Sequence, residues 1–485
     1  MQGEKGKNYL FSDSGAVRTL CIAGILRAVN GIILFFLAVY ALITGAGADR
    51  LLGGIPAFDT FRSISDYNGA GGVIAVIFVY SLIVYLFVLL TLTGVGSIMI
   101  LARKPGGAGL CRSCYAQLRI FFIVFMVLLD VILVLALMDT SLDGYKSGRL
   151  LYTLMLLGAL LNTLIVLLIK YYKGIRNALI DLQTEMLQGE CVYSSTGSLT
   201  GIAIALGVIS ILGQTLPPLF TEIFKINYYS SSGTLSALLG GFNAMLPFLV
   251  AFANIAFRRH IREKSDAKAA QKPYAPSFKS LPDVLGALIM GTFAVYYLYY
   301  FFAHTAQAVS DSYYLEYYWP LMLIYALLPA AFILFCVGLK SRFNPPLIIA
   351  GGIVFSIEEL FYLSYLTFGY FSYTGIYFDW SNLILILHFA WAVLLVIAGF
   401  IAVSRRKAGD PRPVSWGLRL PMLIILALNF ILMMIYRILY SVNIATAVES
   451  VVSYLIFIFG LTLVTLQTGR TEKRALPSEP SDLQN

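Results

Sequence analysis

Long apolar runs separated by short polar segments recur along the whole chain. Twelve of these runs reach about 20 residues or more, the length that a helix needs to cross a bilayer. A transmembrane β-strand would instead alternate apolar and polar residues over roughly ten positions. Backbone groups inside lipid must be paired within the protein, so the pattern predicts an all-α polytopic membrane protein. The predicted spans cover residues 19–43, 72–100, 119–138, 149–170, 198–222, 234–257, 281–303, 317–339, 346–369, 381–403, 419–441 and 446–467.

Basic residues predict how these spans are oriented. Lys and Arg are concentrated in alternate connections, which membrane insertion places on the cytoplasmic side. These connections and the chain ends carry Lys5, Lys7, Arg18, Arg103, Lys104, Arg112, Lys173, Arg176, Arg258, Arg259, Arg262, Lys264, Lys268, Lys272, Lys279, Lys340, Arg342, Arg405, Arg406, Lys407, Arg412, Arg470, Lys473 and Arg474. The opposite loops carry only Arg50, Arg62, Lys146, Arg149 and Lys225. We therefore expect both termini to be cytoplasmic and the protein to lie in the cell membrane.

The longest predicted cytoplasmic connection, 258–280, divides the spans into two sets of six. It is basic, contains proline and has few apolar residues, as expected of a solvated linker. We expect two six-helix halves, 1–257 and 281–468, followed by a disordered cytoplasmic tail, 469–485. This division is consistent with a 6+6 arrangement of helices.

A second cytoplasmic segment, 171–190, places Ile175, Leu179, Leu182 and Leu187 near one helical face. This spacing predicts an amphipathic continuation of the fourth span. The continuation could lie at the membrane interface or dock a partner, and the first alternative is favoured.

Composition narrows the functional classes. The chain has 485 residues, of which 59% are hydrophobic and 12% charged, and its mean hydropathy is +0.82. The predicted loops, all under about 30 residues, are too short to hold a soluble domain. The net charge of +9 follows the loop pattern rather than clustering on one domain, so we expect a lipid bilayer and no nucleic acid as partner. No G-x-x-x-x-G-K-[ST] motif occurs, so nucleotide-driven work would require a separate subunit.

Ionisable residues within the apolar runs are the strongest candidates for function. Asp130 stands alone about halfway along its span, and Glu358 and Glu359 lie side by side near the middle of another. A charged group at mid-helix costs about 2.5–3.5 kcal/mol on insertion scales. The three carboxyl groups are therefore candidates for binding a coupling proton or cation. Asp130 could instead be neutral and link two helices by a hydrogen bond.

His388 is the fourth ionisable candidate. It could relay protons, or it could be a buried histidine that hydrogen-bonds to a neighbouring helix.

Neutral polar residues form a second set of candidates: Asn30, Gln214, Tyr296 and Tyr300. Asn30 is typical of the polar residues that join helices inside membranes. Gln214 precedes two consecutive prolines at 217–218, which predict a break or kink that either lines a pathway or is buried in protein. Tyr296 and Tyr300 share a helical face that could line a cavity for an aromatic, cationic or sugar-like ligand.

The cysteines do not indicate a specific metal site or reaction. Cys111 and Cys114 form a single C-x-x-C in a predicted cytoplasmic loop, which is half of a zinc site, and Cys191 could add a third ligand. No local histidine completes such a site. We expect no metal, no cofactor and no catalytic residue.

These features favour a proton- or cation-coupled secondary transporter of a small molecule. The layout is similar to that of the major facilitator superfamily, but the loop after the second span, LARKPGGAGLCRSC, lacks the Asp-Arg/Gly-Arg signature expected there. No family assignment follows. The alternatives are a membrane subunit that works with a separate ATPase, and a membrane-embedded enzyme acting on lipid-linked substrates. The enzyme ranks lower, because no D-x-D, H-E-x-x-H or Ser/His/Asp arrangement stands out.

Overall fold

The fold is known from a computed structural model of the protein, which describes residues 15–44, 78, 81–102, 104–142, 147–188, 197–216, 218, 234–269, 281–310, 312–340, 344–366, 380–408, 414–440 and 444–468. Within these ranges all regular secondary structure is helical. Eleven helices there are long and apolar enough to cross a membrane. The first predicted span coincides with a further helix, whose described apolar part is Thr19–Ile33. The prediction of an all-α polytopic membrane protein is confirmed.

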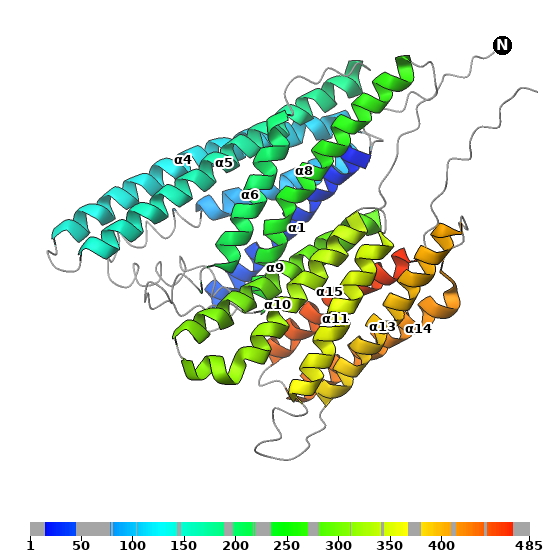
Figure 1. Ribbon diagram of the computed structural model, residues 1–485. Coiled ribbons are helices and arrows are strands. Elements are labelled where there is room, and N and C mark those ends of the chain that lie inside the picture. The colour runs from blue at the N-terminus through cyan, green and yellow to red at the C-terminus, as the bar shows by residue number, and fades with distance from the viewer. Residues whose placement is uncertain are drawn as a thin grey trace, which may run out of the picture. The chain divides into compact units, whose positions relative to one another are not determined.

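Each predicted span coincides with a helix (Figure 1). The helices are α1 (Gly15–Thr44), Ser81–Leu101, α4 (Pro105–Leu142), α5 (Ser147–Gln188), α6 (Gly197–Thr215), α8 (Thr234–Ala269), α9 (Leu281–Ser310), α10 (Ser312–Lys340), α11 (Pro345–Ser364), α13 (Trp380–Lys407), α14 (Trp416–Tyr440) and α15 (Ile444–Gln467).

α4 begins earlier than predicted, and this corrects the position of the C-x-x-C pair. Pro105 is the first residue of the helix, whereas the sequence placed it in a loop. The first turn of a helix accepts proline, because the N–H group that proline lacks would have no partner within the helix there. Cys111 and Cys114 therefore lie inside α4 and are buried, at 1% and 2% exposure, and their predicted place on a cytoplasmic loop is wrong.

α5 continues without interruption to Gln188, which confirms the helical continuation of the fourth span. Burial can be described for two residues of its predicted apolar face, Ile175 and Leu179. Ile175 and Leu179 are buried, and the absence of a side chain at Gly174 lets Leu199 of α6 approach closely. The described part of this face is thus covered by the protein itself.

α8 extends to Ala269, so the first part of the predicted 258–280 linker is helical. The remainder of that linker and the predicted tail, 469–485, lie outside the described residues.

The chain divides into two compact units. The first comprises Met1–Leu212, Ser230–Ser236 and Asn243–Phe278. The second comprises Gly213–Tyr229, Ala237–Phe242 and Lys279–Asn485.

Six helices of the second unit, α9 to α15, form a closed ring. Each helix packs against its described neighbours in the sequence, and α15 packs against α9. The core is unusually rich in aromatic side chains, among which Phe332, Phe335, Phe355 and Trp391 have no exposed surface. These rings surround the polar residues described next.

Candidate functional site

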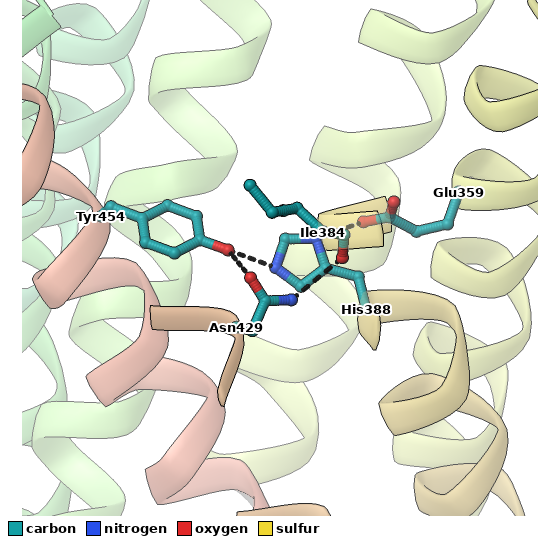
Figure 2. Close-up of polar contacts among 5 residues, drawn as sticks. All are labelled: Glu359, Ile384, His388, Asn429 and Tyr454. Carbon is teal, nitrogen blue, oxygen red and sulfur yellow. Dashed lines mark hydrogen bonds and ion pairs between the residues drawn. The ribbon is translucent and has the colours of Figure 1, made fainter. Parts of the chain in front are cut away.

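Four helices of the second unit bring polar side chains together inside the aromatic core. Glu359 comes from α11, His388 from α13, Asn429 from α14 and Tyr454 from α15 (Figure 2). Glu359 and His388 are 4% and 6% exposed, and Asn429 is fully buried. Nδ1 of His388 lies 3.0 Å from Oε1 of Glu359. Nε2 of the same ring lies 2.9 Å from the Tyr454 hydroxyl.

The antiparallel order of the helices explains how these residues meet. At about 1.5 Å per residue, Glu359 and Asn429 lie roughly 20 Å along helices that begin at one side of the ring. His388 and Tyr454 lie about 12–15 Å along helices that begin at the other side. Neighbours that run in opposite directions therefore present all four side chains at one level, some distance from either membrane surface.

The Tyr454 hydroxyl contacts two possible acceptors, Nε2 of His388 and Oδ1 of Asn429, but has one proton to donate. Tyr454 donates its hydroxyl proton to Oδ1 of Asn429, and Nδ2 of Asn429 donates to the backbone carbonyl of Ile384 over 3.0 Å. The bond to Ile384 fixes which end of the amide faces Tyr454. A hydroxyl has one proton, so Nε2 of His388 must then be the donor in its contact with Tyr454. In this geometry Nε2 of His388 carries a proton, and one further proton lies between Nδ1 and Oε1 of Glu359, held by the imidazole or by the carboxyl group.

Glycines allow α11 and α13 to approach closely enough for the Glu359–His388 contact. A side-chain carbon placed on Gly352 would lie 2.8 Å from Val396, and one on Gly399 would lie 2.5 Å from Ile349. Both positions are thus closed to larger residues. Small residues at a helix interface are a common basis of packing inside membranes.

The adjacent carboxylate, Glu358, has different surroundings. It is 2% exposed, and its Oε2 atom has no hydrogen-bond partner within the described part of the chain; the same holds for Oε2 of Glu359. Glu358 interacts electrostatically with Tyr297 of α9 and Tyr362 of α11. Each carboxylate thus retains one oxygen that accepts no hydrogen bond from the described part of the chain.

Tyr296 and Tyr300, the predicted ligand-lining pair, pack against each other with ring centroids 4.9 Å apart. The tyrosine of α9 that interacts electrostatically with both carboxylates is Tyr297, which the sequence did not single out.

Asp130 and Asn30 lie in the first unit, and each joins two helices. Nδ2 of Asn162 on α5 donates to Oδ1 of Asp130 on α4 over 2.6 Å, and Asp130 is partly exposed. Nδ2 of Asn30 on α1 donates to Oδ1 of Asn243 on α8 over 2.5 Å. Both are contacts of the kind that holds membrane helices together.

Gln214 lies near the end of α6 in the second unit. It is exposed, and its amide packs over the bare backbone of Gly240 on α8. α6 ends at Thr215, shortly before Pro218, as the predicted proline break requires.

Cys111 of the buried C-x-x-C pair makes polar contacts in the first unit. Sγ of Cys111 donates to the Thr93 carbonyl at 3.4 Å and lies 3.9 Å from Oγ of Ser97. Cys191 lies outside the described residues. No group of three or more His, Cys, Asp or Glu side chains within the described ranges could hold a metal ion.

No protein-family model, curated protein or solved structure matches the chain.

Two residues of the network were not among the predicted candidates. Asn429 and Tyr454 each occupy a mid-span position in an apolar run. Their depth, similar to that of Glu359 and His388, is the signal that could have identified them.

Proposed function

We propose that this multi-pass membrane protein is a proton-coupled secondary transporter of a small molecule, with the Glu359–His388 pair as its proton-binding site. The observation that carries the proposal is the buried carboxylate–imidazole contact of 3.0 Å, extended through Tyr454 to Asn429. Ionisable groups inside a membrane are costly and mark ion pathways and proton relays. Apolar residues of similar volume would hold α11 and α13 together without this cost.

The donor pattern favours a proton over a metal cation. A sodium or other hard cation is bound by several converging oxygens. Here Oε1 of Glu359 faces an imidazole nitrogen, and the remaining groups form a chain of N–H and O–H donors. Such a chain can take up and release a proton by rearranging donors and acceptors.

The network also supplies a link between proton binding and helix packing. When His388 loses a proton from Nε2, Tyr454 can donate to that nitrogen instead. Asn429 then loses the hydroxyl donor that ties α14 to α15. A proton leaving the pair would thus weaken a contact between two helices of the ring, which is the kind of local event that shifts a transporter between two conformations.

Proton movement in liposomes tests this proposal. Purified protein is reconstituted with a pH-sensitive dye inside, and pooled amino acids, sugars, peptides or amphipathic cations are added outside. We expect at least one class to drive proton flux in the wild type. Glu359→Gln should abolish that flux, because it removes the carboxyl group that shares a proton with His388.

Asp130→Asn provides the matched control, since it neutralises another carboxyl group within a membrane span and retains an acceptor for Asn162. We expect it to keep the flux. Unchanged flux in Glu359→Gln, or no flux from folded wild-type protein with any class, would refute the proposal.

A further inference from the structure

Glu358 and its neighbour Glu359 face different helices. Two turns earlier α11 carries Gly351 and Gly352, and about seven residues return to nearly the same side of a helix. A side-chain carbon placed on Gly351 would lie 2.7 Å from Phe335 of α10, whereas one placed on Gly352 would lie 2.8 Å from a valine of α13. Glu358 therefore lies on the α10 side of α11, and Glu359 lies on the α13 side.

The part of α10 that Glu358 faces is apolar. α10 and α11 are consecutive antiparallel helices, and a side-chain carbon placed on Gly351 would lie 3.3 Å from the carbonyl oxygen of Ala331. Two turns farther along α11, Glu358 is level with the turn of α10 that carries Ile324 and Leu328. Both are buried, at 2% and 7% exposure, and belong to the hydrophobic core. Glu358 is thus opposite aliphatic side chains.

No Lys or Arg in the described helices of the ring is placed to compensate a charge on Glu358. α9, α11 and α15 contain neither residue, α10 has only Lys340 at its end, and α13 has basic residues only in its last turn. Arg419 and Arg437 of α14 lie 4.2 and 5.8 Å from the centroids of aromatic rings on their own helix. Oε2 of Glu358 also has no hydrogen-bond partner in the described part of the chain.

The titratable side chains around the two carboxyl groups supply no positive charge to Glu358. They come from four other helices of the ring and from α11 itself: Tyr297 of α9, Tyr325 of α10, Tyr362 of α11, His388 of α13 and Tyr454 of α15. A tyrosine is neutral or negative in either protonation state. His388 shares its proton with Glu359, on the α13 side of α11.

A carboxylate in these surroundings would be an isolated buried charge. Burying such a charge without a partner costs far more free energy than burying a neutral acid, so the group takes up a proton. An acid that stayed neutral throughout would add nothing to this packing that an apolar side chain of similar volume does not. Ionisable groups inside membranes mark proton pathways instead.

We infer that Glu358 is a second proton-binding residue, which holds its own proton as a neutral carboxylic acid and releases it after the Glu359–His388 pair has released one. The inference rests on the proposed transport function and deepens it, because the loaded ring then carries two protons. In the release step the O–H bond of the acid breaks, the proton goes to solvent and the carboxylate keeps the electron pair. Two adjacent buried carboxylates resist being ionised together, so the two protons leave in separate steps.

Infrared spectroscopy of the carboxyl groups tests this inference. The carbonyl stretch of a neutral carboxylic acid is separate from the bands of a carboxylate. Protein reconstituted in liposomes is measured across the pH range in which circular dichroism shows it to be folded. We expect a neutral-acid band that disappears from the wild type as the pH rises and that is absent from Glu358→Gln, in which the side chain keeps its size. Asp130→Asn, which neutralises a carboxyl group of another span, should keep this band.

Glu359→Gln adds a readout that a purely structural role of Glu358 would not change. The Glu358 band should remain in this variant and disappear at a lower pH than in the wild type, because the neighbouring carboxylate is gone. The inference is overturned if Glu358→Gln keeps every neutral-acid band of the wild type, since Glu358 would then be ionised. It is also overturned if the Glu358 band persists at every pH at which the protein is folded, since the residue would then never release a proton.

The infrared bands and the liposome flux separate this inference from the proposed function. A Glu358 band that titrates, in a folded protein that shows no substrate-driven proton flux, would refute transport while the second proton site stands. Substrate-driven proton flux that Glu359→Gln abolishes, with the same infrared bands in Glu358→Gln and the wild type, would refute the second site while the proton-binding pair stands.

Discussion

Tyr454→Phe removes one oxygen atom from the centre of the polar network, and its effect on stability can be worked out from the contacts. The oxygen donates to Asn429 and accepts from His388, so two hydrogen bonds are lost. Side-chain hydrogen bonds within membranes average about 0.6 kcal/mol each, which gives a lower limit of about 1.2 kcal/mol. Oδ1 of Asn429 is left in a fully buried position, and burying an unsatisfied polar group costs about 1–3 kcal/mol. We therefore expect a loss of about 1.2–3 kcal/mol in the free energy of unfolding.

Reversible unfolding in mixed detergent micelles, followed by circular dichroism, measures this loss. Tyr436→Phe is the matched control, because the Tyr436 hydroxyl makes no hydrogen bond within the described part of the chain while its ring packs at 5.1 Å from that of Tyr440. The control should change the unfolding free energy by less than about 0.5 kcal/mol. Equal effects of the two substitutions would show that Tyr454 does not bridge His388 and Asn429.

Three further predictions concern other parts of the structure. Gly399→Val should destabilise the protein by about 1–3 kcal/mol and reduce proton flux, because the added side chain forces α13 away from α11. Gly201→Val is the control and should be near neutral, because Gly201 has open space around it. Equal unfolding curves for the two variants would refute the close packing at Gly399. Asp130→Asn should lower the unfolding free energy by less than about 1 kcal/mol, and a larger loss would mean that the negative charge itself is needed. Cys111 and Cys114 should resist maleimide labelling until the protein unfolds, when all other cysteines are replaced by serine; rapid labelling of the folded protein would place them on an accessible loop.

The helices were predictable because lipid imposes length and continuous hydrophobicity on them. The apolar runs alone located every described span, and the misplaced start of α4 has a specific cause. Pro105 and the glycines after it are typical of a loop, but proline is equally compatible with the first turn of a helix. The burial of Cys111 could not be read from local sequence, because it depends on packing against Thr93 and Ser97 of the preceding helix.

The candidate site was only partly predictable for a similar reason. Glu359 and His388 were identifiable one at a time, because a charged group in an apolar run is conspicuous. Their contact was not, since it depends on α11 lying next to α13. Tyr454 is one of 31 tyrosines in the chain, and most tyrosines in membrane proteins serve packing or the interface. What distinguishes it is its position opposite His388, which exists only once the ring of helices has closed.

The protonation of His388 is the measurement that tests the proton-binding network most directly. Nitrogen NMR of the imidazole, in a protein that retains His388 as its single histidine, reports whether each ring nitrogen carries a proton. We predict that Nε2 carries a proton in the state described here, and that titration to higher pH moves the ring proton to Nδ1, where the Glu359 carboxylate accepts it and Tyr454 donates to Nε2. In Glu359→Gln the pair has no proton to lose, so this change should not occur. An Nε2 atom that lacks a proton throughout, or one that keeps its proton in the wild type across the whole pH range in which the protein is folded, would contradict the account.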